Sequence, residues 1–537
     1  MPLLEINDLS VSIDKSPILN SISMELSAGE VLGLAGESGS GKTMTALAVA
    51  GLLPARAEMS GQVILDGLHL SDTDEHEFCK IRGQDIGIVF QEPMTALNPV
   101  MTIGEQVAET VRVHRNLTRR EARLLARETL DKVGLSSSRF PMDRYPHDLS
   151  GGQRQRVAIA IAIVLKPKLL IADEPTTALD VTTQAEILVL FRKLVRDDGV
   201  GLILVTHDLA VVAETADRVA VMKSGSIVEQ GSVAKVFQTS DAPYIKTLME
   251  NAVHVPKRTS RDIGTTPVLE TRNITREYPG VRKLFGTGES LRAVDDVSFR
   301  IFSNENIGLV GESGCGKSTL LRTILGLDRA QAGEVRVFGQ QFPPDRNDEM
   351  RQLRQRIQVV FQDPFGTFDP RWRVEQLVAE NFHLLDSPPT RKEARQKVDE
   401  ILDRVGMKSS DADRYPHEFS GGQRQRIAIA RALITEPSII ALDEAVSALD
   451  VSIRAQILDL LAELSDRLGV SYLFVTHDLS VARAITDRVL VMKDGRIVEE
   501  GKTADVFDNP THPYTAELLN AVPDIDRALS NRLAGST

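Results

Sequence analysis

The stretch Leu149-Ser150-Gly151-Gly152-Gln153-Arg154-Gln155-Arg156 recurs almost unchanged, 270 positions further along the chain, as Phe419-Ser420-Gly421-Gly422-Gln423-Arg424-Gln425-Arg426. Asp173-Glu174 and Thr206-His207-Asp208 recur at the same offset, as Asp443-Glu444 and Thr476-His477-Asp478. Solenoid units recur about every 20 to 50 residues. A period this long predicts two copies of a whole domain, in a chain of 537 residues that is long enough for both.

A segment of different composition separates the two copies. Residues 251–267 are rich in Pro, Lys, Arg, Thr and Ser and show no helical or strand periodicity. We therefore predict a first domain at 1–250, a short flexible linker at 251–267, and a second domain with a C-terminal extension at 268–537.

Each copy has the pattern of an α/β domain with a mainly parallel sheet, because short apolar runs alternate with amphipathic helical stretches. In the first copy, the runs 31–35, 169–172 and 202–205 precede a glycine-rich loop, Asp-Glu and Thr-His-Asp. The runs 307–310, 439–442 and 472–475 do the same in the second. Open α/β sheets bind ligands at the carboxyl ends of their strands. Lys223-Ser224-Gly225 and Lys493-Asp494-Gly495 predict hairpin turns, which we place away from that edge.

The glycine-rich loops are Gly36-Glu37-Ser38-Gly39-Ser40-Gly41-Lys42-Thr43 and Gly311-Glu312-Ser313-Gly314-Cys315-Gly316-Lys317-Ser318. Both fit G-x-x-x-x-G-K-[ST], in which backbone N–H groups wrap a phosphate, lysine neutralises it, and the last hydroxyl ligates Mg²⁺. The alternative is a glycine turn that binds nothing. Two occurrences, each after a strand and before a helix, favour phosphate binding.

The polar residues at the other strand ends complete a hydrolytic site. Asp173 and Asp443 are expected to hold Mg²⁺ through water, and the adjacent Glu174 and Glu444 to polarise the attacking water. The alternative is that each Asp-Glu pair is simply exposed to solvent at a strand end. The recurrence of the pair after an apolar strand in both copies argues against that alternative.

Two further pairs of residues have the right chemistry to join this site. His207 and His477 are suited to sense or stabilise a γ-phosphate. Gln91 and Gln362 can offer an amide oxygen to Mg²⁺ and an NH₂ to water. A single histidine is usually a surface or core residue without a function, and a single glutamine is weak evidence of a functional site. The two histidines, however, recur beside the same set of polar residues.

Bulk properties narrow the class of protein. The formal charge of −12 disfavours nucleic-acid binding, although a local basic patch is compatible with it. Only Cys79 and Cys315 are present, which fits a reducing compartment. The N-terminus lacks a secretory pattern, and no apolar run approaches the roughly 20 residues of a membrane helix. These features predict a cytosolic protein that reaches a membrane only through partners.

Together these motifs resemble the ATP-binding-cassette (ABC) ATPases, and the resemblance spans nearly the whole chain. It rests on Leu-Ser-Gly-Gly-Gln and Phe-Ser-Gly-Gly-Gln, which match the family's signature loop, and on Ala178-Leu179-Asp180 and Ala448-Leu449-Asp450, which match its D-loop. The resemblance implies a P-loop fold with a helical subdomain and an antiparallel β region. It also implies that the two cassettes pair head to tail within the chain.

That pairing implies two composite ATP sites, and because neither copy lacks the lysine, glutamate or histidine, we predict that both hydrolyse ATP. The first joins Gly36, Ser38, Gly39, Gly41, Lys42, Thr43, Gln91, Asp173, Glu174 and His207 to Ser420, Gly421, Gly422, Gln423 and Asp450. The second joins Gly311, Ser313, Gly314, Gly316, Lys317, Ser318, Gln362, Asp443, Glu444 and His477 to Ser150, Gly151, Gly152, Gln153 and Asp180.

The two copies depart from the family pattern in different places. Tyr278 fits the aromatic residue that stacks on adenine, whereas Ile13 stands at the aligned position in the first copy. We align Asn304-Glu305-Asn306 with Ala28-Gly29-Glu30, a change without a sequence-level explanation. Ala445 replaces Pro175, from which we expect modest effects on loop rigidity.

Flanking segments are similar to those of the dipeptide, oligopeptide and nickel importer subfamily in its fused form. They are Gln91 to Pro99, Arg144-Tyr145-Pro146-His147, Arg414-Tyr415-Pro416-His417, and Asn509 to Thr515. This similarity implies two membrane permease subunits, contacted near 92–99 and 363–370, an extracytoplasmic solute-binding protein, and a peripheral location on the cytoplasmic face. No cysteine follows Ala242-Pro243-Tyr244 or Pro513-Tyr514-Thr515, so we expect no iron–sulfur cluster. A soluble two-cassette ATPase acting on ribosomes or nucleic acid and a sugar-importer ATPase remain alternatives.

Overall fold

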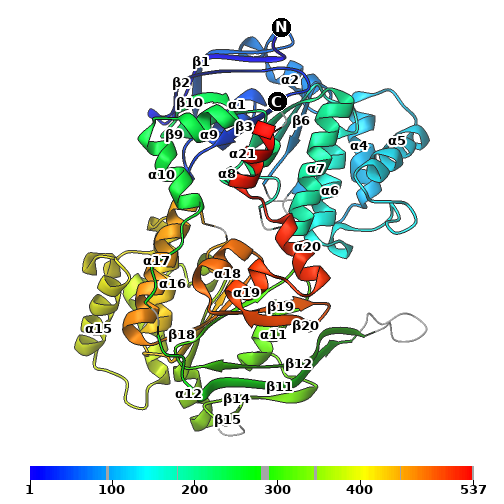
Figure 1. Ribbon diagram of the computed structural model, residues 1–537. Coiled ribbons are helices and arrows are strands. Elements are labelled where there is room, and N and C mark those ends of the chain that lie inside the picture. The colour runs from blue at the N-terminus through cyan, green and yellow to red at the C-terminus, as the bar shows by residue number, and fades with distance from the viewer. Residues whose placement is uncertain are drawn as a thin grey trace.

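The computed structural model describes residues 1–91, 96–177, 179–259, 261–279, 290–343, 347–447 and 449–534. It contains two similar α/β units, one above the other in Figure 1. We call the unit from β1 to α10 the first cassette and the unit from β11 to α20 the second cassette. The predicted duplication and fold class are confirmed.

A six-stranded, mainly parallel sheet forms the centre of each cassette. The strand order in the first is β10 (Ser226–Ser232), β9 (Arg218–Lys223), β3 (Val31–Ala35), β8 (Gly201–Val205), β7 (Leu169–Asp173) and β6 (Ile86–Val89). In the second, the order is β20 (Arg496–Lys502), β19 (Arg488–Lys493), β13 (Asn306–Val310), β18 (Ser471–Thr476), β17 (Ile439–Asp443) and β16 (Ile357–Val360). Only β10 and β20 run antiparallel to their neighbours. All six predicted strands are present, and β3, β8 and β7 are buried throughout because both faces of the sheet are covered.

An antiparallel four-stranded sheet flanks each central sheet. The strand orders are β2 (Ser16–Leu26), β1 (Leu4–Ile13), β4 (Ala57–Leu65), β5 (Leu68–His69), and β12 (Leu291–Phe302), β11 (Pro267–Tyr278), β14 (Ala332–Val337), β15 (Gln340–Phe342). The buried residues of β1, such as Leu4, Ile6 and Leu9, pack with Leu32 and Ile171 in one core. The two sheets of a cassette therefore share their apolar side chains.

Helices cover the central sheets and form a separate helical part in each cassette. In the first cassette they are α1 (Lys42–Val49), α2 (Glu75–Ile81), α4 (Ile103–His114), α5 (Arg119–Lys132), α6 (Gly151–Ile163), α7 (Val181–Asp198), α8 (Leu209–Thr215), α9 (Val233–Thr239) and α10 (Pro243–Ala252). In the second they are α11 (Lys317–Ile324), α12 (Asn347–Arg356), α13 (Pro364–Thr367), α14 (Val374–Ala379), α15 (Arg391–Arg404), α16 (Gly421–Leu433), α17 (Val451–Leu468), α18 (Leu479–Ile485), α19 (Thr503–Asp508) and α20 (Pro513–Ala521). The chain ends with α21 (Ile525–Ala534). The packed helices α4, α5 and α6, and α14, α15 and α16, are the predicted helical subdomains.

The hairpin turns lie at the ligand-binding edge of the sheets, so our placement of them away from it was wrong. β9 runs parallel to β3, and the turn at its carboxyl end therefore lies beside the glycine loop that follows β3. The Gly225 N–H donates to the Ser40 carbonyl at 3.0 Å, and the Gly495 N–H donates to the Cys315 carbonyl at 2.9 Å. Each hairpin supports a phosphate-binding loop.

Our alignment of the turn before β13 was wrong by one residue. Gly29 and Asn304 both have positive φ, at 71° and 63°, so Asn304 takes the place of Gly29 and Glu305 that of Glu30. Asparagine tolerates this left-handed conformation better than most residues. Asn306 consequently replaces Val31 as the first residue of the central strand.

The segment after α10 has no helix or strand before β11 in its described residues, but it lies against the second cassette. His254 bonds Asp459 at 2.7 Å, and Arg258 pairs with Asp487 at 2.8 Å. Helix α10 packs against α17, and α20 packs against α7. These contacts pair the two cassettes within one chain, as predicted.

The last helix crosses back to the first cassette. Figure 1 shows α21, in red, beside α8. Ile525 and Leu529 are buried in the core of the first cassette, and Arg527 pairs with Glu214 of α8 at 3.1 Å. The end of the predicted second domain therefore packs with the first. Among the described helices, none is both long and apolar enough to span a bilayer.

Candidate active site

The two glycine loops adopt a backbone conformation that depends on glycine. Gly36 and Gly311 have φ of 146° and 152°. A Cβ at Gly36 would lie 2.3 Å from the Met222 carbonyl oxygen, and a Cβ at Gly311 would lie 2.2 Å from that of Met492. Only glycine fits at these positions, because the loop turns closely against the neighbouring strand end.

The loop lysines are buried and held by the loops themselves. Lys42 Nζ donates to the carbonyls of Gly36 and Glu37 at 2.8 and 2.9 Å, and Lys317 Nζ makes the equivalent bonds at 2.7 Å each. Burial lowers the pKa of Lys42, while the charges of Glu174, Asp173 and Asp450 oppose this shift. Asp450 belongs to the second cassette, so the charge of its D-loop acts on the lysine of the first.

The aspartates at the strand ends fit a divalent cation. Thr43 Oγ1 donates to Asp173 at 3.3 Å. In the second cassette, Asp443 Oδ1 is buried without a hydrogen-bond partner among the described residues. Burial and the charge of Glu444 raise the pKa of Asp443 to about 6. A buried carboxylate oxygen without a donor is suited to a hydrated metal ion, which supports the predicted Mg²⁺ ligands.

The glutamates contact the predicted histidines and glutamines in both cassettes. Glu174 accepts from Gln91 at 2.8 Å and bonds His207 Nδ1 at 3.1 Å. Glu444 accepts from Gln362 at 2.8 Å, and its Oε1 lies 3.2 Å from Nδ1 of His477. Three residues from separate strands thus meet at one carboxylate in each site.

The environment of these glutamates keeps them ionised. Burial alone would raise the pKa of Glu174, but the hydrogen bond and charge of His207 outweigh it, and the pKa is lowered. His477 lowers the pKa of Glu444 in the same way. Both glutamates have positive φ, 46° and 49°. Such strained residues cluster at functional sites, and an ionised, oriented carboxylate can act as a base toward water.

The signature residues form capped helix N-termini. Ser150 Oγ accepts the N–H of Gln153, and the Gln153 side chain accepts the N–H of Ser150; Ser420 and Gln423 repeat this arrangement. Free N–H groups at a helix start favour anions. Binding of nucleotide by these residues and by Gly151, Gly152, Gly421 and Gly422 remains a prediction.

The D-loop aspartates begin the next helices. Asp180 caps α7 and Asp450 caps α17 through their side chains. Ala178 and Ala448 of the same motifs lie outside the described residues. The predicted contacts of both aspartates with nucleotide are untested.

The adenine positions differ between cassettes. Tyr278 and Ile13 are both the last residue of the first strand of their sheet. The Arg276 guanidinium lies over the Tyr278 ring, 4.7 Å from its centroid, and the hydroxyl contacts Asp328 at 3.3 Å. The ring is therefore oriented by its neighbours, and stacking on adenine remains a prediction.

Thr182, the second residue of α7, contacts the opposite glycine loop. Thr182 Oγ1 lies 2.7 Å from a carboxylate oxygen of Glu312 and 2.7 Å from one of Asp180, and it donates its single proton to one of them at a time. The equivalent Ser452 instead accepts from Asn251 at 3.0 Å. Sequence reasoning missed Thr182, although its position two residues after the D-loop aspartate was a usable signal.

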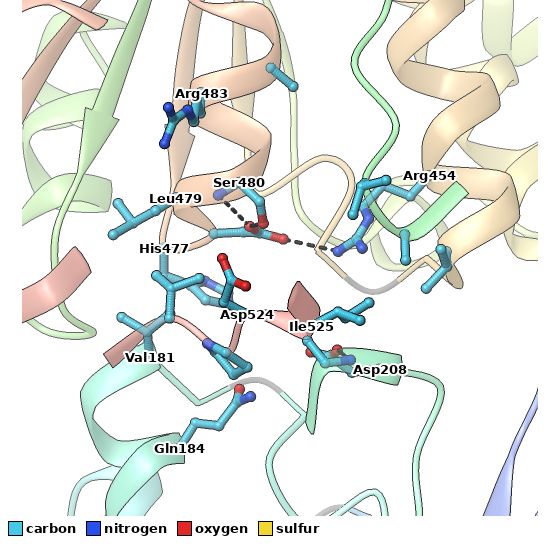
Figure 2. Close-up of a pocket in the computed structure, with 18 of the residues that line it drawn as sticks. Val181, Gln184, Asp208, Arg454, His477, Leu479, Ser480, Arg483, Asp524 and Ile525 are labelled. Atoms are coloured by element: carbon cyan, nitrogen blue, oxygen red, sulfur yellow. Dashed lines mark hydrogen bonds and ion pairs between the residues drawn. The ribbon is translucent and has the colours of Figure 1, made fainter. Parts of the chain in front are cut away.

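A cavity of about 580 Å³ lies between the cassettes. His207 and His477 both line it, and Figure 2 shows Asp524 and Ile525 of the C-terminal segment in its wall with Val181 and Leu479. The two histidine regions thus face a common space, which the C-terminal segment partly closes.

The Tyr-Pro-His segments anchor the signature helices. Arg154 donates to the Pro146 carbonyl at 2.7 Å, and Arg424 donates to that of Pro416 at 3.0 Å. Of the predicted permease-contacting segments, residues 92–95 lie outside the described part of the chain.

A protein-family model described as ABC transporter matches residues 19–177 and 294–447, which together are more than half of the chain. The chain belongs to the ABC transporter family. A second model, described as the oligopeptide/dipeptide transporter C-terminal region, matches residues 498–537 of this ABC protein.

Relatives match this ABC protein over nearly its whole length. The glutathione import ATP-binding protein GsiA of Pectobacterium atrosepticum is 41% identical, and the alignment covers 99% of this chain and 91% of the relative. GsiA of Escherichia coli K12 is 43% identical, with 95% and 87% covered. The protein is thus a fused two-cassette ABC subunit that binds and hydrolyses ATP.

Proposed function

We propose that this protein is the motor of an importer for small peptide-type solutes, with glutathione as the first candidate cargo. The near full-length match to glutathione import ATP-binding proteins is the observation that carries the proposal. The match of the C-terminal region to oligopeptide and dipeptide transporters supports the broader solute class. Two permease subunits, an extracytoplasmic binding protein and a peripheral position on the cytoplasmic face follow from that role.

Each site would use its residues in the same order. Lys42 and Lys317 would exchange their loop carbonyls for phosphate oxygens, and Glu174 and Glu444 would orient and accept a proton from the attacking water. Mg²⁺, held by Thr43, Gln91 and Asp173 or by Ser318, Gln362 and Asp443, would neutralise charge on the phosphates. ATP contacted from both cassettes would favour their closure, and hydrolysis would remove those contacts.

Reconstitution tests the proposal. The chain should co-purify with two multi-spanning permeases encoded beside it, and the complex in vesicles should take up labelled glutathione in the presence of ATP and the binding protein. The matched control is the complex with Glu174→Gln and Glu444→Gln. Uptake of a dipeptide but not of glutathione would narrow the cargo, while recovery of the chain with ribosomes and without permeases would overturn the importer role.

A further inference from the structure

Both cassettes place a tyrosine hydroxyl on the glycine loop, at the start of a helix that the ATP site does not otherwise use. Tyr244 and Tyr514 follow a proline at the start of α10 and α20, and they are 270 positions apart, the same offset as the signature motifs. The Glu37 N–H donates to the Tyr244 hydroxyl at 3.4 Å, and the Glu312 N–H donates to the Tyr514 hydroxyl at 3.1 Å. The contact is thus duplicated along with the site.

The same peptide group also holds the lysine. The carbonyl of Gly36 accepts from Lys42 Nζ at 2.8 Å, and the carbonyl of Gly311 accepts from Lys317 Nζ at 2.7 Å. The Gly36 carbonyl and the Glu37 N–H belong to one planar peptide group, as do the Gly311 carbonyl and the Glu312 N–H. The tyrosine and the lysine therefore bind opposite ends of one peptide group, and release of the tyrosine end would let that group turn and displace the carbonyl that orients the lysine.

Each tyrosine is itself held firmly. Lys223 and Lys493, at the ends of β9 and β19, lie 4.4 Å from the centroids of the Tyr244 and Tyr514 rings. Tyr514 is only 2% exposed. Burial raises the pKa of Tyr244 to about 12, so its hydroxyl stays protonated. The Glu37 carboxylate and the Met222 carbonyl, each at 3.4 Å, are the two acceptors available to its single proton.

The turn before each tyrosine is anchored by an equivalent glutamate. Glu499 accepts the N–H groups of Thr511 and His512 at 2.7 and 3.1 Å. Glu229 accepts from the hydroxyl of Ser240. These contacts fix where the following helix begins, and therefore where the tyrosine lies.

We propose that Tyr244 and Tyr514 are positioning residues for ATP binding, each holding its glycine loop so that the loop lysine is aligned with the phosphates. The helices that carry them also pack against α17 and α7 of the opposite cassette. Each tyrosine therefore links its own phosphate loop to the helix that follows the opposite D-loop. This role concerns the ATP site alone and does not depend on the identity of the transported solute.

Removal of the hydroxyl alone tests the proposal, because Tyr→Phe keeps the ring and its contact with Lys223 or Lys493. ATP binding to the second site is measured with Mg²⁺ present in the full chain carrying Lys42→Ala, and binding to the first site in the chain carrying Lys317→Ala. We expect Tyr514→Phe to raise the Kd for ATP by about three- to tenfold, the worth of one ordinary hydrogen bond. Tyr244→Phe, with the longer bond, should raise it by about twofold. In both single variants with the lysines intact, the ATP concentration that gives half-maximal turnover should rise in the same direction as the Kd.

Tyr472→Phe is the matched control. Tyr472 is fully buried in the second cassette, and its hydroxyl donates to the Leu461 carbonyl at 3.1 Å. It should lower the thermal unfolding midpoint without changing the Kd for ATP. A Kd that is unchanged in Tyr514→Phe, or raised equally in Tyr472→Phe, would overturn the proposal. If Tyr514→Phe does not fold, Tyr244→Phe carries the same decision.

Discussion

The two cassettes have nearly the same contacts around the predicted catalytic glutamates, but they differ in the contacts that join one cassette to the other. The contacts of Glu174 with Gln91 and His207 are reproduced by Glu444, with distances that differ by about 0.1 Å. By contrast, Thr182 bonds the opposite glycine loop while its counterpart Ser452 bonds Asn251. The contacts around the predicted catalytic glutamates are thus duplicated, whereas Thr182 and Ser452 contact different partners.

The asymmetry has a covalent origin. A single linker follows α10, and a single extension follows α20, so only one cassette can receive each segment. The linker residues His254 and Arg258 bind the second cassette, whereas α21 binds the first. The two predicted ATP sites can therefore experience different constraints during opening and closing.

The largest expected effect tests the equality of the two centres. Glu174→Gln and Glu444→Gln together should leave ATP binding intact and reduce turnover by about a hundredfold or more, because each removes the carboxylate that accepts a proton. Single variants with equal turnover would show equivalent centres. Steady-state phosphate release measures this, and full hydrolysis by the double variant would contradict the assigned role.

The second prediction concerns the helix that crosses between cassettes. Ile525→Ala with Leu529→Ala should destabilise the first cassette by about 3 kcal/mol or more, since both side chains lie in its core. Hydrogen exchange should increase in α8 and not in the equivalent α18. Arg527→Ala, which removes a partly exposed ion pair with Glu214 and a hydrogen bond to the Val522 carbonyl, is the control and should destabilise the cassette less than the double variant does. Equal exchange in α8 and α18 would contradict the docking.

A third, smaller effect is expected at the contact between Thr182 and Glu312. Thr182→Val removes the hydroxyl that donates to Glu312 but keeps the side-chain volume, so it should cost about 1.5 kcal/mol. Ser452→Ala should cost less, because its partner Asn251 is an uncharged amide. Denaturant unfolding and hydrogen exchange of residues 311–318 measure the difference. Equal losses of unfolding free energy in the two variants would show that the contacts of Thr182 and Ser452 contribute equally, which would contradict the prediction.

The smallest effect is expected at the adenine positions. Tyr278→Ile should weaken ATP binding at the second site by about 1 kcal/mol if the ring stacks on the base, and Ile13→Tyr should strengthen the first site by a similar amount. The affinity for ATP of each variant is measured in a chain in which the glycine-loop lysine of the other site, Lys42 or Lys317, is replaced by alanine. Unchanged affinity in both exchanges would exclude stacking at this strand end.

Sequence reasoning predicted the parts of the site that each depend on a short local pattern. A glycine loop between strand and helix, or an Asp-Glu pair ending an apolar strand, requires only its neighbours in the chain. The hairpin at Gly225 was misplaced because its position depends on which strand pairs with β3, which no local pattern states. Tyr244 and Tyr514 were present as a repeat at the same offset, but their partners lie about 200 residues away.

The sequence by itself determined the duplication, the α/β class and the residues that are predicted to contact phosphate, because periodicity and glycine placement constrain the backbone locally. The tertiary structure alone decided which cassette receives the linker and α21, and how Asn306, in the place of Val31, satisfies its buried amide by accepting from Tyr472 N–H and donating toward Ser465. Such contacts join segments that are remote in sequence. They depend on how the packed elements meet in space, which residue order does not specify.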